Sequence, residues 1–219
     1  MDTNCSETSE ERRFFVQLVD AESGYAVHEY DCGAHDIGWI CGKFSCDPAD
    51  VTGVNRFELD ADGIALANEL FGLSIDVDYE YVDLYSWSAA DGFPYRVHSN
   101  RELPLMLAGQ KPLSVFIERC PATEGEVETP ENLFERYVAE GILIKREYCE
   151  PIATMRPAYF GIRVVLYALK GEEWRLDAYI LVRGLARKLG WSEPLTRLEG
   201  TLLGYSEWQN DAFIRSAGA

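Results

Sequence analysis

The most regular stretch of this chain runs from Leu73 to Tyr81, where apolar side chains alternate with polar ones. Alternation with a period of two is the pattern of a strand that buries one face and exposes the other. We therefore predict a strand here, with its apolar side chains in a core. The acidic side chains on its exposed face are then Asp76, Asp78 and Glu80.

Shorter patterns in the first 120 residues also predict strands, separated by two short helices. Two apolar runs around a Ser-Gly turn indicate a hairpin. Asp62 is placed to cap a helix over Gly63–Phe71, and a second short helix ends at Gly109. The predicted strands besides Leu73–Tyr81 are Phe14–Val19, Tyr25–Tyr30, Ile37–Phe44, Phe93–His98 and Leu113–Glu118.

Longer helical patterns appear in the last 90 residues. A helix that begins at Pro130 and ends near Glu140 is followed by strands at Ile142–Tyr148 and Phe160–Leu169. Three helices then complete the chain, and Gly190 ends the first of them. Its apolar face is predicted to consist of Trp174, Ala178, Leu181, Val182, Leu185 and Leu189.

These patterns predict an α+β fold: a strand-rich N-terminal part with two short helices, then a helix, two strands and a three-helix C-terminal tail. The expected organisation is a flexible N-terminus (1–13), an acidic strand-rich unit (14–120), an acidic linker (121–129) and an α+β unit with the helical tail (130–219). In the alternative, 14–219 forms one continuous domain.

Charge is distributed unevenly along the chain. The formal net charge is −17, and residues 1–100 alone carry 20 acidic and 5 basic side chains. A segment with this excess of acidic side chains is not expected to bind nucleic acid directly, and its charge favours binding to a basic protein partner. The predicted partner-binding residues are Asp76, Asp78, Glu80, Asp83, Glu29 and Asp31.

A second hypothesis is a site for a small anionic ligand in the second half of the chain. Arginine guanidinium groups and tyrosine hydroxyls are suited to phosphate or carboxylate recognition. The same arginines are also explained by pairing with nearby glutamates. The residues concerned are Arg146, Arg156, Arg163, Tyr148, Tyr159 and Tyr167.

Two stretches partly match metal-binding patterns. Cys32, His35, Cys41 and Cys46 have zinc-ligand chemistry, but their spacing is unlike that of paired zinc knuckles, so we expect core thiols and no metal. Glu58–Glu69 resembles a calcium loop, yet Leu66 stands where a ligand is needed. A capped helix after an acidic turn is the better interpretation.

No catalytic motif or cofactor-binding signature is found, so enzymatic activity stays open and no cofactor is expected. The N-terminus lacks a secretion signal and no apolar run could span a membrane, which predicts a cytoplasmic protein. The first functional hypothesis is a non-enzymatic soluble binding protein of the immunity, antitoxin or inhibitor kind. The alternatives are an enzyme or sensor for the anionic ligand, and a helical assembly or adaptor protein. The sequence leaves the oligomeric state open.

Overall fold

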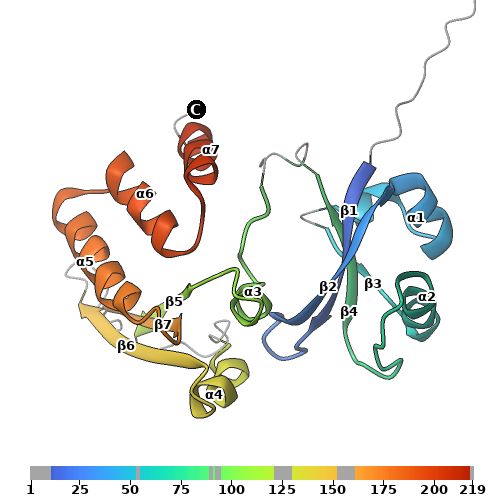
Figure 1. Cartoon of the computed structure of the whole chain (residues 1–219), viewed down its shortest axis with the longest axis horizontal. Helices are drawn as coiled ribbons and strands as arrows, with labels where there is room; N and C mark the ends of the chain where they lie inside the picture. Colours follow the sequence, from blue (N-terminus) through green and yellow to red (C-terminus); the bar gives the residue numbers. More distant parts are fainter. Residues whose placement is uncertain are drawn as a thin grey trace, which may run out of the picture. The chain divides into compact units, whose positions relative to one another are not determined.

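The computed structural model describes residues 11–52, 55–88, 91, 95–120, 130–151 and 161–217. The chain forms two compact units, Met1–Val97 (unit 1) and His98–Ala219 (unit 2). Each unit holds one antiparallel sheet with helices, and unit 2 ends in a helical tail (Figure 1). The predicted α+β class is confirmed.

Unit 1 is built on a four-stranded antiparallel sheet whose central strands are β1 and β4. The predicted hairpin is present, because β1 pairs with β2 along its whole length. On its other side β1 pairs with β4, which in turn pairs with the short edge strand β3. The strands are β2 (Ala26–Asp36), β1 (Glu11–Val19), β4 (Val82–Trp87) and β3 (Phe57–Glu58).

Two helices cover one face of this sheet, α1 (Ile37–Phe44) and α2 (Ala61–Phe71) (Figure 1). They pack on alternate strand residues to form a core. A 3₁₀ turn, Pro48–Asp50, follows α1. The fully buried members of this core include Phe14, Val16, Ile40, Ile64, Ala67, Val82 and Leu84.

The strand predicted over Ile37–Phe44 was wrong, because this segment is the helix α1. The Asp36 carboxylate accepts a hydrogen bond from the backbone N–H of Trp39, which caps the helix start. Ile40, Cys41 and Phe44 are buried at helical spacing. The β-branched and aromatic composition suggested a strand, but capping and a period of 3.6 residues decide the structure.

The strand predicted over Leu73–Tyr81 was also wrong. This segment connects α2 to β4 and forms no strand ladder. Asn68 of α2 holds it in place: its side chain donates to the carbonyl of Ile75 at 2.8 Å and accepts from the Ile75 N–H at 2.9 Å. Leu73, Ile75 and Tyr79 do pack on the core. The alternation therefore identified three of the core-facing side chains, but Val77 and Tyr81 are exposed, and the backbone pairs with an amide side chain instead of a strand.

Strand β1 begins at Glu11, inside the N-terminus that was expected to be flexible up to residue 13. Arg12 is only 5% exposed. Its guanidinium donates to the Ser86 hydroxyl at 2.8 Å and forms an ion pair with Asp91. Because these partners satisfy the guanidinium, a charged residue is tolerated inside the unit. Residues 1–10 lie outside the described part of the chain.

Unit 2 contains a three-stranded antiparallel sheet with β7 in the centre. All three strands fall where the sequence predicts them: β5 (Leu113–Cys120), β7 (Gly161–Leu169) and β6 (Leu143–Pro151). Phe134 of α4 (Glu131–Ala139) stacks on Tyr167 at one face. At the other face, Leu176 and Tyr179 of α5 (Trp174–Leu189) join a core with Val164.

The remaining helices of unit 2 are α3 (Glu102–Leu107), α6 (Glu193–Leu202) and α7 (Glu207–Ala217). The bounds of α5 agree with the predicted helix, but most of its predicted apolar face is exposed. Of that face only Val182 is fully buried, beside Leu176, Tyr179 and Ala186. No helix in the described residues is long and apolar enough to cross a membrane.

The boundary between the units, at Val97 and His98, differs from the expected boundary at 121–129. Strand β5 is the reason, since it pairs with β7 of unit 2. The expected unit 14–120 is therefore divided between the two units. Residues 121–129 lie outside the described residues.

Candidate functional site

The six predicted partner-binding acids fall into two groups. Asp76, Asp78 and Glu80 are exposed on the connection between α2 and β4. The Asp76 carboxylate accepts from the N–H of Asp78 at 3.1 Å, so the two acids share a turn. The regular spacing expected of a strand is therefore absent, but the charges remain at the surface.

The other three acids, Glu29, Asp31 and Asp83, lie on the strands of unit 1, and each has an arginine partner. Arg13 binds Asp31 at 2.6 Å and Arg96 binds Glu29 at 2.9 Å. Asp83 lies 3.8 Å from Arg56.

Glu29 and Asp83 belong to a polar row on the sheet face opposite α1 and α2. The strand registers place Glu29, Gln17, Asp83 and Glu58 side by side across β2, β1, β4 and β3. The Tyr85 hydroxyl donates to Glu29 at 2.6 Å. Burial raises the pKa of Asp83; Arg56 opposes this shift, whereas nearby Glu58 adds to it. Sequence patterns do not reveal this row, because it depends on strand register.

The predicted anionic-ligand residues do not form an open cationic site. Arg163 binds Glu118, Glu131 and Glu147, and Arg146 binds Asp177. Hydrogen bonds from Arg163 and Lys145 hold the pKa of Glu131 down at about 2. Burial raises the pKa of Tyr148 to about 12 and raises that of Tyr167 further. Arg156 and Tyr159 lie outside the described residues.

The cysteines and the histidine of the zinc-like pattern are dispersed over β2, α1 and the turn after α1. Cys46 donates its backbone N–H to the Cys41 carbonyl at 3.3 Å. His35 instead stacks on Trp39, with ring centroids 5.4 Å apart. Burial raises the pKa of both Cys32 and Cys46 to about 12. Among the described residues, no group of three or more His, Cys, Asp or Glu side chains could hold a metal ion.

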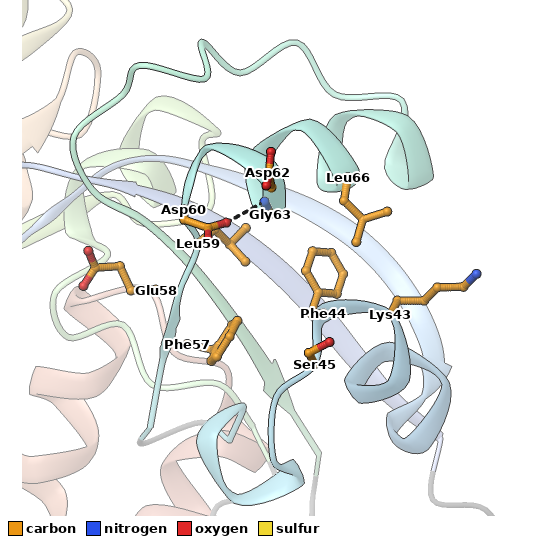
Figure 2. A pocket seen from close by; sticks show the side chains of 10 residues that line it. All are labelled: Lys43, Phe44, Ser45, Phe57, Glu58, Leu59, Asp60, Asp62, Gly63 and Leu66. Atoms are coloured by element: carbon orange, nitrogen blue, oxygen red, sulfur yellow. Dashed lines mark hydrogen bonds between the residues drawn. The ribbon is translucent and has the colours of Figure 1, made fainter.

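A hollow of about 330 Å³ opens beside the edge strand β3 (Figure 2). Three segments enclose it: the end of α1, the two-residue strand β3 and the start of α2. Ser45 ends α1 in a left-handed conformation (φ 55°), and Asp60 caps α2 by accepting from the Gly63 N–H at 2.8 Å. We call this the β3 hollow; its lining is Lys43, Phe44, Ser45, Phe57, Glu58, Leu59, Asp60, Asp62, Gly63 and Leu66.

The floor of the β3 hollow is apolar and its rim is acidic. Figure 2 shows Phe44, Phe57 and Leu66 around the opening, with Asp60 and Asp62 on one side. In the described part of the chain, neither aspartate forms an ion pair. Lys43 extends away from the aspartates, and its ammonium lies 5.9 Å from the centre of the Trp39 ring. The carboxylates are therefore not neutralised from within the hollow.

A wider and shallower depression of about 710 Å³ continues on the other side of β3. It shares Phe57 and Glu58 with the β3 hollow. Its other lining residues are Asp50, Asn55 and Arg56. The edge strand thus lines two concave surfaces, whose lining residues include more acids than bases.

The sequence drew attention to Glu58, Asp60 and Asp62 only as a partial calcium loop. The structure gives them a different setting, because aromatic residues from α1 and β3 complete the hollow. In comparisons with models of protein families, with curated proteins and with solved structures, the chain matches none of them.

Proposed function

We propose that this chain is a non-enzymatic binding protein that engages a basic protein partner through unit 1. The β3 hollow accepts a lysine or arginine side chain of that partner. The observation that carries this proposal is the combination of an aromatic floor with two carboxylates that have no ion-pair partner in the described residues.

The lining suits a long cationic side chain. Lysine and arginine carry an apolar stem below a charged head, so the stem packs on apolar surface while the head stays with polar groups. Phe44 and Phe57 offer that surface, and aromatic faces also attract cations. Asp60 and Asp62 then meet the charged head. A carboxylate of a partner would instead be repelled at this rim.

The charge of unit 1 supports a basic partner as well. Up to Val97 the chain carries 20 acidic and 5 basic side chains. The four arginines of its described part are each paired with an acid. The remaining acids form a negative field that speeds the approach of a basic protein.

The six acids first expected to bind the partner therefore receive different roles. Asp76, Asp78 and Glu80 are exposed and have no ion pair in the described residues, so they act as steering charges. Glu29, Asp31 and Asp83 are held by arginines, and we assign them to the stability of the sheet. The anchoring contact is made at the β3 hollow.

The test compares two sets of charge removals. In one variant Asp60→Asn and Asp62→Asn remove the rim charge, and asparagine keeps the helix cap at position 60. The matched control variant, Asp76→Asn with Asp78→Asn and Glu80→Gln, removes charge from the loop. Binding of fluorescein-labelled nonapeptides with a central Arg or Lys is followed by anisotropy and stopped flow, with an acidic peptide as negative control.

We expect the rim variant to weaken peptide binding at least about tenfold, mainly through faster dissociation. The loop variant should slow association about threefold and leave dissociation unchanged. Raising the salt concentration should erase the difference in association rate. The proposal is wrong if no basic peptide binds, or if the rim variant binds as tightly as the wild type.

A further inference from the structure

The helix α5 exposes a continuous apolar stripe. Its members are large side chains that face solvent: Trp174 is 57% exposed, Leu181 64% and Leu189 78%. Leu185 lies on the same side of the helix, and the smaller, half-buried Ala178 borders this side while it packs partly on the core. Single exposed leucines are common on protein surfaces, but an aligned row of them marks an interaction site.

The spacing within this stripe indicates what covers it. Trp174, Ala178, Leu181 and Leu185 follow one another at intervals of four, three and four residues. Such a 3–4 repeat keeps one seam of a helix facing a second helix. The opposite face of α5 already packs on the sheet through Leu176, Tyr179, Val182 and Ala186. The exposed seam is therefore a second packing surface of the same helix.

Charge along α5 is polarised from one end to the other. Glu172, Glu173 and Asp177 stand at its start, whereas Arg187 and Lys188 occupy its last turn. Asp177 and Lys188 are both exposed and flank the seam near its two ends, and Asp177 also forms an ion pair with Arg146 of β6. When two such helices lie antiparallel, the acidic end of each faces the basic end of the other. A surface that is complementary to itself in this way suits a two-fold symmetric dimer.

We propose that the chain forms a two-fold symmetric homodimer through antiparallel packing of α5 against α5 of a second copy. Leu181 and Leu185 lie at its centre, and Asp177 of each copy faces Lys188 of the other. A contact made mainly by one 16-residue helix belongs to the smaller class of interfaces. The dimer therefore dissociates in the micromolar range, on the order of 10 µM.

The proposal does not depend on the basic partner of unit 1, and the two have different salt dependences. An apolar seam persists when salt screens charges, whereas a partner bound by carboxylates is released. Further exposed apolar side chains occur in the helical tail and its connections: Trp191, Leu198, Trp208 and Phe213.

The test uses sedimentation velocity of the full chain from about 1 to 200 µM, a range that brackets the expected dissociation constant. We expect the average mass to rise from 24.7 kDa towards twice that value. Leu181→Glu replaces an exposed residue with a good helix former, so the fold should persist while the dimer weakens at least about tenfold. Ile142→Glu, at an exposed apolar residue outside α5, is the matched control and should leave the dimer intact.

Charge-exchange variants test whether the molecule that covers the seam of α5 is a second copy of this chain. Asp177→Lys or Lys188→Asp alone places like charges together and should weaken the dimer. The double variant restores both pairs and should recover most of the wild-type affinity. A wild-type chain that stays at 24.7 kDa throughout the range overturns the proposal. So does a dimer that is insensitive to Leu181→Glu, or a double variant weaker than either single one.

Discussion

The two units differ in how the faces of their sheets are covered. Unit 1 covers one face of its sheet with α1 and α2 and carries a polar row on the other face. Unit 2 places α4 on one face of its sheet and α5 on the other. With 20 acids and 5 bases, unit 1 is strongly negative, whereas unit 2 has 17 acids and 15 bases.

This difference separates two kinds of binding surface. In unit 1 the exposed features are carboxylates, and within its described residues Asp60 and Asp62 of the β3 hollow form no ion pair. In unit 2 the charges neutralise one another, as Arg163 does with three glutamates, and the exposed feature is the apolar seam of α5. The two proposals therefore differ in their expected response to salt: binding of a basic partner to unit 1 should weaken as salt is raised, whereas dimerisation through unit 2 should not.

The largest effect is expected from Phe134→Ala in unit 2. Phe134 is almost fully buried and stacks on Tyr167 at 4.4 Å between ring centroids. Its removal should lower the free energy of unfolding of unit 2 by about 3–5 kcal/mol. Hydrogen exchange measured peptide by peptide should show the loss in unit 2 and unchanged protection in unit 1. Equal loss in both units would contradict the division into two units.

Arg12→Met tests the buried charge of unit 1. Methionine keeps much of the side-chain volume, but Asp91 loses its cation and Ser86 a hydrogen-bond donor. Removal of one partner from a buried ion pair should cost about 3 kcal/mol in a denaturant titration. Arg13→Met is the control, because the Arg13–Asp31 pair is exposed and should cost under about 1 kcal/mol. Equal losses in the free energy of unfolding would show that burial does not determine how much each ion pair contributes to stability.

Lys111 makes the stability of unit 2 depend on pH. It is buried, and burial lowers the pKa of its ammonium from 10.5 to about 8, although Glu102 opposes the shift. Between these values the unfolded chain binds more protons, so this residue stabilises unit 2 increasingly as pH rises. Relative to Lys111→Met, the wild type should gain on the order of 2 kcal/mol of stability between pH 7 and pH 10.

The stability difference between the two proteins should therefore change steadily from pH 7 to pH 10, in favour of the wild type. The comparison with Lys111→Met matters because cysteines and tyrosines begin to titrate above about pH 9. They titrate in both proteins, so their contribution cancels. A difference between the two proteins that stays constant from pH 7 to pH 10 would rule out a depressed pKa for Lys111.

A smaller effect is expected from Gly200→Ala, where α6 and α7 approach closely. An added Cβ would lie 2.0 Å from the amide oxygen of Asn210, a buried residue of α7. Asn210 also donates to the Thr201 hydroxyl at 3.2 Å. The buried Asn210 side chain must turn away and give up its hydrogen bond, or the two helices must separate, at a cost of about 1–2 kcal/mol in thermal unfolding. Gly184→Ala, at a helix position with open space, should be neutral or slightly stabilising.

The sequence predicts most of unit 2 and less of unit 1. The strand at 161–169 is a long apolar run, the strand at 113–120 begins with one, and α5 repeats its pattern over 16 residues. Over Leu73–Tyr81 the alternation reports the core side chains only as far as Ile75 and Tyr79, since Val77 and Tyr81 are exposed, and it does not reveal whether a strand partner exists. In α5 two apolar faces compete, and only the packed sheet decides that Leu176 and Tyr179 are buried.

The β3 hollow could not be predicted because none of its parts is a motif. Phe44, Phe57 and Leu66 come from three separate elements, and their meeting depends on the turns at Ser45 and Asp60. The acids Asp60 and Asp62 were visible in the sequence, yet their chemistry changes with the aromatic floor beside them.

The place of β1 in its sheet also sets an order of events during synthesis. The first strand of unit 1 is central, and its second neighbour, β4, begins only at Val82. The β1–β2 hairpin therefore emerges from the ribosome with one hydrogen-bonding edge open until β4 is made. In unit 2 the central strand β7 is made last, so β5 and β6 have no partner until Leu169 has emerged. The sheet of unit 1 can therefore be assembled outward from its first strand, whereas the sheet of unit 2 can be assembled only when its last strand has been made.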